Sequence, residues 1–160
     1  MKTVRKDVLE LFKGVKLYDG RLDGKVDVRL LRSLSNSILK TRVDGHEILY
    51  FSGKLIGGEF GKKIGKCDMK RFSASITELI GGLKIGDIES VCEGKDGLTV
   101  RVSGCPLCDP GKPDGDTRCH FSAGLLAGIA SEAMQRNAIG KEIDCKSTDK
   151  DVCVFKLGFL

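Results

Sequence analysis

Cysteines gather in the last third of this chain, and cysteine is the residue type here with the most chemistry to offer. Five of the seven cysteines follow residue 104: Cys105, Cys108, Cys119, Cys145 and Cys153. The first two form a CPLC motif, whose two intervening residues let both sulfurs reach one tetrahedral ion. The same spacing also serves thiol–disulfide exchange. The sequence therefore indicates metal or redox chemistry.

The other three cysteines lie at the edges of expected elements. Cys119 opens a predicted helix over residues 119–136, where the positive end of the helix dipole favours a thiolate. Cys145 and Cys153 are eight residues apart and flank the turn of an expected hairpin, so their side chains could converge on one ion. Glu142 precedes Cys145 by three residues and is near enough to ligate or to support a ligand.

Two sets of ligands for one ion stay open on this reasoning. The first is Cys119, Glu142, Cys145 and Cys153, and the second brings in Cys105 and Cys108. His120, beside Cys119, is a further alternative as a ligand or as a hydrogen-bond partner of a thiolate. Zinc is the expected metal, and iron is the alternative because thiolates hold it equally well. Cys67 and Cys92 stand alone and are interpreted as small core residues.

The elements that must position these residues follow from hydrophobic periodicity. Helices are predicted over residues 4–12, 28–41, 45–63, 69–84 and 119–136, and strands over 88–92, 98–102, 140–146 and 152–157. A small strand or hairpin is expected within 15–28. The strands form two hairpins, the first closed by Gly94–Lys95–Asp96–Gly97 and the second by a turn around residues 148–150. The fold class is therefore α+β, with one antiparallel sheet of about four strands packed against a helical layer.

The helix predicted over residues 45–63 contains three interior glycines, Gly53, Gly57 and Gly58. Glycine inside a helix is unfavourable, so three of them suggest close approach of another helix or a ligand. We expect the following residues of this helix to face inward: Ile48, Leu49, Phe51, Leu55, Ile56 and Phe60.

Composition narrows the functional classes. A chain of 160 residues is expected to be a single domain over 1–160, with an extension at 1–27 and a core at 28–158. The net charge of +5 is scattered, which argues against nucleic-acid binding. No apolar run approaches the roughly 20 residues of a membrane span, and the first residues do not resemble a secretory signal. We therefore expect a cytoplasmic protein with reduced thiols.

Several stretches of this sequence resemble the V4R domain family, named for a 4-vinyl reductase. They are CHFSAGLLAG at 119–128, GKEIDC at 140–145, CVF at 153–155 and, less specifically, LYFSGKLIG at 49–57. The likeness extends over residues 28–158 and is strongest after Gly104. It implies an α+β fold shared with a Golgi-transport tethering subunit family and with nitric-oxide-sensing domains.

The resemblance also implies a particular zinc site. In members of the family that sense aromatic effectors, cysteines and a glutamate near this end hold zinc, and the matching positions are Cys119, Glu142, Cys145 and Cys153. The CPLC pair is less general in the family. It could join the site, replace Glu142 or act as a redox pair.

The resemblance further implies a pocket between the helices and the sheet for a small apolar or aromatic ligand. The residues available to line it are Tyr50, Phe51, Phe60, Phe72 and Phe121. We therefore expect a sensory domain that binds a hydrocarbon or aromatic-type ligand, carries structural zinc and signals through a homodimer or a protein partner. The alternatives are a thiol-based redox sensor and a vinyl-reductase-like enzyme, and the sequence has no nicotinamide or flavin fingerprint for the latter.

Overall fold

The computed structural model of the chain describes residues 28–41, 43–108, 119–145 and 152–160. The helix predicted over 4–12, nearly all of the segment predicted over 15–28 and the turn predicted around 148–150 lie outside these residues.

Four strands form one antiparallel sheet: β1 (Asp87–Gly94), β2 (Gly97–Ser103), β3 (Ala138–Asp144) and β4 (Val152–Phe159). Their order is β1-β2-β4-β3, so β3 and β1 are the edges of the sheet. Gly94 pairs with Gly97 across a two-residue turn, which confirms the first predicted hairpin. The antiparallel pairing of β3 with β4 confirms the strands of the second.

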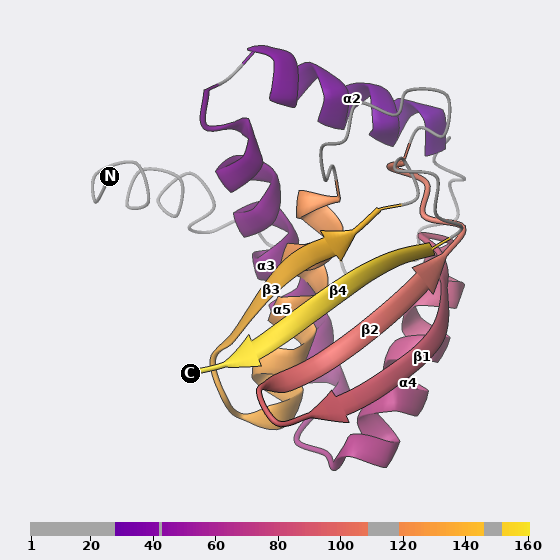
Figure 1. Cartoon of the computed structure of the whole chain (residues 1–160), viewed down its shortest axis with the longest axis vertical. Helices are drawn as coiled ribbons and strands as arrows, with labels where there is room; N and C mark the ends of the chain where they lie inside the picture. Colours follow the sequence, from indigo (N-terminus) through magenta and orange to yellow (C-terminus); the bar gives the residue numbers. More distant parts are fainter. Residues whose placement is uncertain (1–27, 42, 109–118, 146–151) are drawn as a thin grey trace.

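Within the described residues, four helices accompany the sheet: α2 (Val28–Thr41), α3 (Gly45–Ile64), α4 (Met69–Gly82) and α5 (His120–Met134). Helices α3, α4 and α5 cover one face of the sheet, and α2 lies across one end of the molecule (Figure 1). The helices and strands predicted within the described residues are all present, with ends that differ by at most two residues. The α+β architecture with about four antiparallel strands is confirmed.

Helices α3 and α5 are in direct backbone contact. The buried face of α3 has a small or apolar residue at every fourth position: Gly45, Leu49, Gly53, Gly57 and Gly61. A Cβ at Gly57 would overlap the carbonyl oxygen of Leu125, and one at Gly128 would overlap that of Lys54. Gly53 and Gly57 thus mark the close approach of another helix, which is one of the two predicted alternatives, whereas a Cβ at Gly58 would meet nothing within 4 Å.

The predicted inward face of α3 is wrong in part. Leu49 alone of the six predicted residues is buried, and Leu55 keeps 38% of its surface exposed. The glycines of α3 lie nearest to α5 because only glycine permits such a close approach of the two helix backbones. The larger side chains therefore lie along the flanks of the helix.

The core lies between the helices and the sheet. Alternate residues of β4 point toward the helices, among them Cys153, Phe155 and Leu157, and all three are completely buried. Phe72 and Ile76 of α4 are equally inaccessible and belong to the same cluster. Cys153 thus extends the row of core residues to the end of the sheet where β4 begins.

Candidate metal centre

Several chain segments meet at one end of the sheet, where β2 and β3 end and β4 and α5 begin (Figure 1). The segment after β2 brings the CPLC motif, and Cys119 directly precedes α5. Glu142 and Cys145 come from the end of β3, and Cys153 pairs with Val102 at the start of β4. The fold therefore gathers residues that are distant in the sequence.

The sulfur atoms of this cluster lie in van der Waals contact or closer. Cys108 Sγ is 3.1 Å from Cys119 Sγ, 3.1 Å from Cys153 Sγ and 3.4 Å from Cys145 Sγ. Cys119 Sγ and Cys153 Sγ are 4.0 Å apart. A disulfide would need about 2.05 Å, whereas a tetrahedral zinc with Zn–S bonds of about 2.3 Å separates its sulfurs by about 3.8 Å. The separations of 3.1–4.0 Å are too long for disulfides and are closer to those of thiolates around one ion.

Glu142 brings a carboxylate into the same place. Its Oε2 accepts a hydrogen bond of 2.9 Å from the backbone N–H of Cys119. Its Oε1 is buried and has no hydrogen-bond partner among the described residues. Burial raises the pKa of Glu142 to about 8, and the N–H of Cys119 acts in the opposite direction. A buried oxygen without a partner is costly, and a bound cation would satisfy it.

Hydrogen bonds between the thiols govern their ionisation. Thiol hydrogen bonds from Cys108 and Cys119 hold the pKa of Cys105 well below its usual value of 9.0. Hydrogen bonding to Cys105 in turn raises the pKa of Cys119, Cys108 and Cys153. The first thiolate to form thus keeps its neighbours protonated. A divalent cation would allow several thiolates to coexist, since metal binding displaces the protons of its ligands.

The donor set therefore fits a metal ion. One ligand atom from each of five buried residues lies within 4.8 Å of all the others: Cys108, Cys119, Glu142, Cys145 and Cys153. Thiolate and carboxylate donors in a closed tetrahedral arrangement suit zinc. An iron–sulfur cluster would place several irons and sulfides between the cysteines, whereas sulfur separations of 3.1–4.0 Å leave room for one ion.

Both predicted ligand sets are thus represented in one place. All four residues of the first set belong to the group of five, and Cys108 joins them. Cys105 Sγ lies 3.3 Å from Cys119 Sγ but is outside that mutually close group. His120 Nε2 lies 2.6 Å from His46 Nδ1 on the exposed side and is also outside it. Which of these residues bind the metal stays a prediction.

The two cysteines outside the cluster differ from each other. Cys67 is half-buried and packs against the core, as expected. Cys92 is exposed on edge strand β1, so its interpretation as a core residue is wrong. On an edge strand that is largely open to solvent, a small side chain can point outward without cost.

Arg32 contacts the CPLC motif, and this contact was not predicted from the sequence. Its Nε donates a hydrogen bond of 2.8 Å to the carbonyl oxygen of Pro106, inside the CPLC motif. The two residues are 74 positions apart, and nothing in the local sequence around Arg32 points to the contact. This hydrogen bond ties the motif to α2.

The five aromatic residues predicted to line a pocket occupy different environments. Phe72 is completely buried in the core, and Tyr50 Oη accepts a hydrogen bond of 3.1 Å from the N–H of Gly140. Phe51 lines a surface hollow of about 350 Å³ along α3 and α5. Phe60 and Phe121 are partly buried against the core. A common pocket for these five residues stays a prediction.

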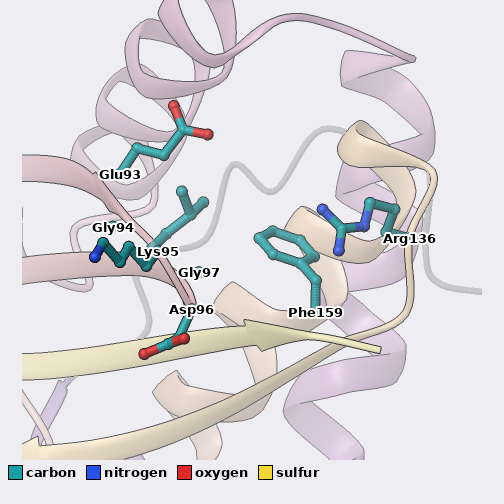
Figure 2. Close-up of a pocket in the computed structure, with 8 residues that line it drawn as sticks. Glu93, Gly94, Lys95, Asp96, Gly97, Arg136 and Phe159 are labelled. Carbon is teal, nitrogen blue, oxygen red and sulfur yellow. The ribbon is translucent and has the colours of Figure 1, made fainter.

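Two further hollows open on the surface. One, of about 400 Å³, lies between the β1–β2 turn and the end of α5, with the Arg136 guanidinium 4.9 Å from the centre of the Phe159 ring on one side and Glu93 on the other (Figure 2). The other, of about 420 Å³, lies between Ile64 and the end of α4. None of the five predicted aromatic residues lines either of these two hollows.

Across the parts of the chain that the structure describes, no helix is both long enough and apolar enough to span a membrane.

Comparison with known families and sequences adds an independent finding. The V4R domain pattern matches residues 98–159, which include every residue of the cluster. An uncharacterized protein of Methanocaldococcus jannaschii is 30% identical over 139 residues, covering 85% of this chain and 80% of its own length. A second from the same organism is 24% identical over 154 residues, covering 96% and 87%.

Solved structures of several kinds of protein have a similar fold. A vinyl-4-reductase family protein from M. jannaschii has a TM-score of 0.62 at 19% identity and covers 100% of this chain and 97% of its own. The phenol-responsive sensory domain of the transcription activator PoxR, solved with phenol, has a TM-score of 0.63 at 12% identity and covers 99% and 90%.

The other two match the fold relatives expected from the sequence. An H-NOX protein from S. oneidensis has a TM-score of 0.58 at 14% identity and covers 99% of this chain and 89% of its own. Subunit 3 of a trafficking protein particle complex from Naegleria fowleri, covalently bound to palmitic acid, has a TM-score of 0.54 at 14% identity and covers 99% and 92%. The expected relation of this fold to transport and nitric-oxide-signalling proteins is confirmed.

Proposed function

The chain belongs to the V4R domain family, and we propose that it is a ligand-binding sensory domain in which one structural zinc ion joins α5 to the β3–β4 hairpin. The observation that carries the zinc proposal is the buried group of four thiols and one carboxylate with an unpartnered oxygen. Such a group is costly without a cation and fits the preferences of zinc.

Zinc would be held by Cys119, Cys145 and Cys153 together with a fourth donor, either Glu142 or Cys108. These residues belong to the start of α5, the end of β3 and the start of β4, so the ion would cross-link three elements. A structural zinc contributes directly to folding because its site does not exist in the unfolded chain. Four protein donors leave no open coordination position, which favours a structural role over a catalytic one and speaks against a vinyl-reductase-like enzyme that works through this metal.

The proposed ligand is a small apolar or aromatic molecule. Two proteins of similar fold were solved with such molecules, one with phenol and one with palmitic acid. The aromatic residues proposed to contact this ligand are Tyr50, Phe51 and Phe60 of α3, Phe72 of α4 and Phe121 of α5. We place the protein in the cytoplasm, where thiols stay reduced, with its signal passed to a second copy or to a protein partner.

Zinc-dependent stability tests the metal proposal. Metal-free wild type, Cys145→Ser and Cys92→Ser should be unfolded thermally with and without zinc. At zinc about 1,000 times the Kd, the melting temperature of wild type should rise by roughly 8–16 °C. Cys92→Ser should behave like wild type because Cys92 is exposed on β1, whereas Cys145→Ser should lose most of the shift. Equal shifts in all three proteins would contradict the proposal.

Two probes test the ligand proposal on the zinc-loaded protein. Phenol and palmitic acid should be titrated calorimetrically into wild type and into Phe121→Ala. Saturable binding of at least one probe, weakened in the variant, is the expected result. If neither probe binds saturably, the proposed ligand class is wrong while the zinc proposal stands.

A thiol-based redox sensor is the second candidate. Cys105 is a surplus thiol beside the group of five, 3.3 Å from Cys119 Sγ. Hydrogen peroxide would take two electrons and two protons from these thiols, forming the disulfide and two waters, and Cys119 would be lost as a ligand. Mass spectrometry after peroxide treatment should then find a Cys105–Cys119 disulfide together with released zinc. Retention of zinc and of all thiols would exclude this candidate.

A further inference from the structure

We propose that the hollow of about 350 Å³ along α3 and α5 binds a small carboxylate with an apolar or aromatic body, whose charged group is held by Lys54. This site goes beyond the proposed function, because it opens to the surface beside exposed residues of α3. It depends neither on zinc nor on the pocket expected between the helices and the sheet.

Lys54 is a half-buried cation without an acidic partner. Its Nζ donates to Asn137 Oδ1 at 3.0 Å and to the carbonyl oxygen of Ala138 at 2.8 Å, and both acceptors are neutral. Lys54 forms no ion pair with a residue that the structure describes, and burial lowers its pKa. An ammonium has three N–H donors, so the third can donate to a ligand. A carboxylate bound there would offset the loss of hydration that burial imposes on the charge.

Phe51 and Leu55 give this ammonium an apolar neighbourhood. Both residues line the same hollow, and their spacing from Lys54 places all three on one side of α3. Phe51 is partly buried, and Leu55 keeps 38% of its surface exposed. A ring or a short hydrocarbon bound against them would cover apolar surface that otherwise faces water.

Two glycines, Gly58 and Gly128, also line the hollow. Helix packing explains Gly128, because a Cβ there would overlap the carbonyl oxygen of Lys54. It does not explain Gly58, where a Cβ would meet nothing within 4 Å. Glycine inside a helix is unfavourable, so its presence at this position fits a need to keep the hollow free of a side chain. The volume of about 350 Å³ is at the lower end of the usual range for ligand pockets, which favours a small ligand.

The charges around the hollow orient the ligand. Lys62, about two helical turns beyond Lys54, forms an ion pair of 2.6 Å with Glu59 and is also attracted by Glu132. Lys54 is thus the one cation of the lining that has no acidic partner among the described residues. The carboxylate is therefore placed at Lys54, with the apolar body against Phe51 and Leu55.

Benzoate and benzamide test the proposal, since they have nearly the same shape and differ in charge. Each should be titrated into the protein and followed by amide chemical shifts. Benzoate should bind saturably, with shifts grouped around Gly58 and Gly128, and benzamide should bind about tenfold more weakly or worse. Lys54→Met should weaken benzoate binding to a similar extent. Lys63→Met, exposed on the same helix and outside the hollow, is the matched control and should bind like wild type.

Gly58→Leu is a second variant, which fills free space at the hollow and leaves Lys54 in place. It should stay folded and lose benzoate binding. Octanoate should be titrated as an aliphatic counterpart of benzoate. Absence of saturable binding of both carboxylates to wild type, equal affinities for benzoate and benzamide, or wild-type affinity in Gly58→Leu would each overturn the inference. The proposed function would still stand, because phenol and palmitic acid test it through Phe121→Ala.

Discussion

At the scale of single residues, the cluster shows why cysteine and glutamate can be buried together at the end of this sheet. Each thiol alone is a small apolar group that suits a core. A carboxylate with an unpartnered oxygen does not, and Glu142 is the one buried charged residue among those described. A cation bound at this point would satisfy the unpartnered oxygen of Glu142 and would cross-link the chain segments that carry its ligands.

Tyr50 gives a prediction of pH dependence. Burial raises the pKa of this phenol above 10.0, although the N–H of Gly140 acts in the opposite direction. Because the folded state holds the proton more tightly than the unfolded chain, the contribution of Tyr50 to stability is present below pH 10 and is lost as the pH rises through the folded pKa. Tyr50→Phe should remove this alkaline loss, measured as the free energy of unfolding against pH.

At neutral pH the Tyr50→Phe protein should be less stable by about 0.5–1.5 kcal/mol, since the N–H of Gly140 loses its acceptor. Parallel stability curves for Tyr50→Phe and wild type above pH 10 would contradict the prediction.

Residue types and spacing predicted much of the candidate site. The intervals between the residues left two ligand sets open, and the resemblance to the V4R family favoured Cys119, Glu142, Cys145 and Cys153. The structure brings these four residues together with Cys108. The central position of Cys108 could not be predicted, because it depends on the path of the segment after β2 relative to three other elements. The contact between Arg32 and Pro106 could not be predicted either, because it also depends on the path of the segment after β2.

At the scale of elements, the contact between α3 and α5 positions the start of α5 and therefore Cys119. Glycines on both helices let the backbones meet, so the register between the helices is fixed by main-chain contact. The interior glycines predicted a close approach, but the sequence could not tell a helix from a ligand as the approaching group. It also misplaced the inward face, since hydrophobic periodicity assigns the largest residues to the core.

Two neighbouring glycines test this account of α3. A Cβ at Gly57 would overlap the carbonyl oxygen of Leu125, whereas a Cβ at Gly58 would meet nothing within 4 Å. Gly57→Ala should therefore destabilise the protein by about 1–3 kcal/mol, and Gly58→Ala should stabilise it by about 0.5–1 kcal/mol. Chemical denaturation of both variants measures the difference. Similar stabilities for the two would show that α3 and α5 are not in backbone contact.

The link between α2 and the CPLC motif gives a second prediction at this scale. Arg32→Met removes the hydrogen bond to Pro106 and frees the loop. Zinc should then pass to a competing chelator faster than from wild type, while the number of bound ions stays the same. Arg71→Met, on the exposed face of α4, is the matched control. Equal rates of zinc loss from the two variants would show that α2 does not hold the loop.

At the scale of the whole molecule, the arrangement of helices and strands was the most predictable feature. Alternation in the strands and apolar periodicity in the helices are local, and they predicted every described element to within two residues. The order β1-β2-β4-β3 places the closing hairpin beside the first hairpin, with β4 in the interior of the sheet. Because β4 pairs with β2, Cys153 at the start of β4 lies beside the end of β2 and near the other cysteines.

The central claim is that the buried cluster holds one metal ion, and elemental analysis of anaerobically purified wild type tests it most directly. The account predicts about one zinc per chain, and loss of this zinc in Cys145→Ser together with most of the zinc-dependent rise in melting temperature. Wild type that contains no metal as purified, although it is folded with all seven thiols reduced, would contradict the claim and would leave these cysteines as redox groups or as residues of the core.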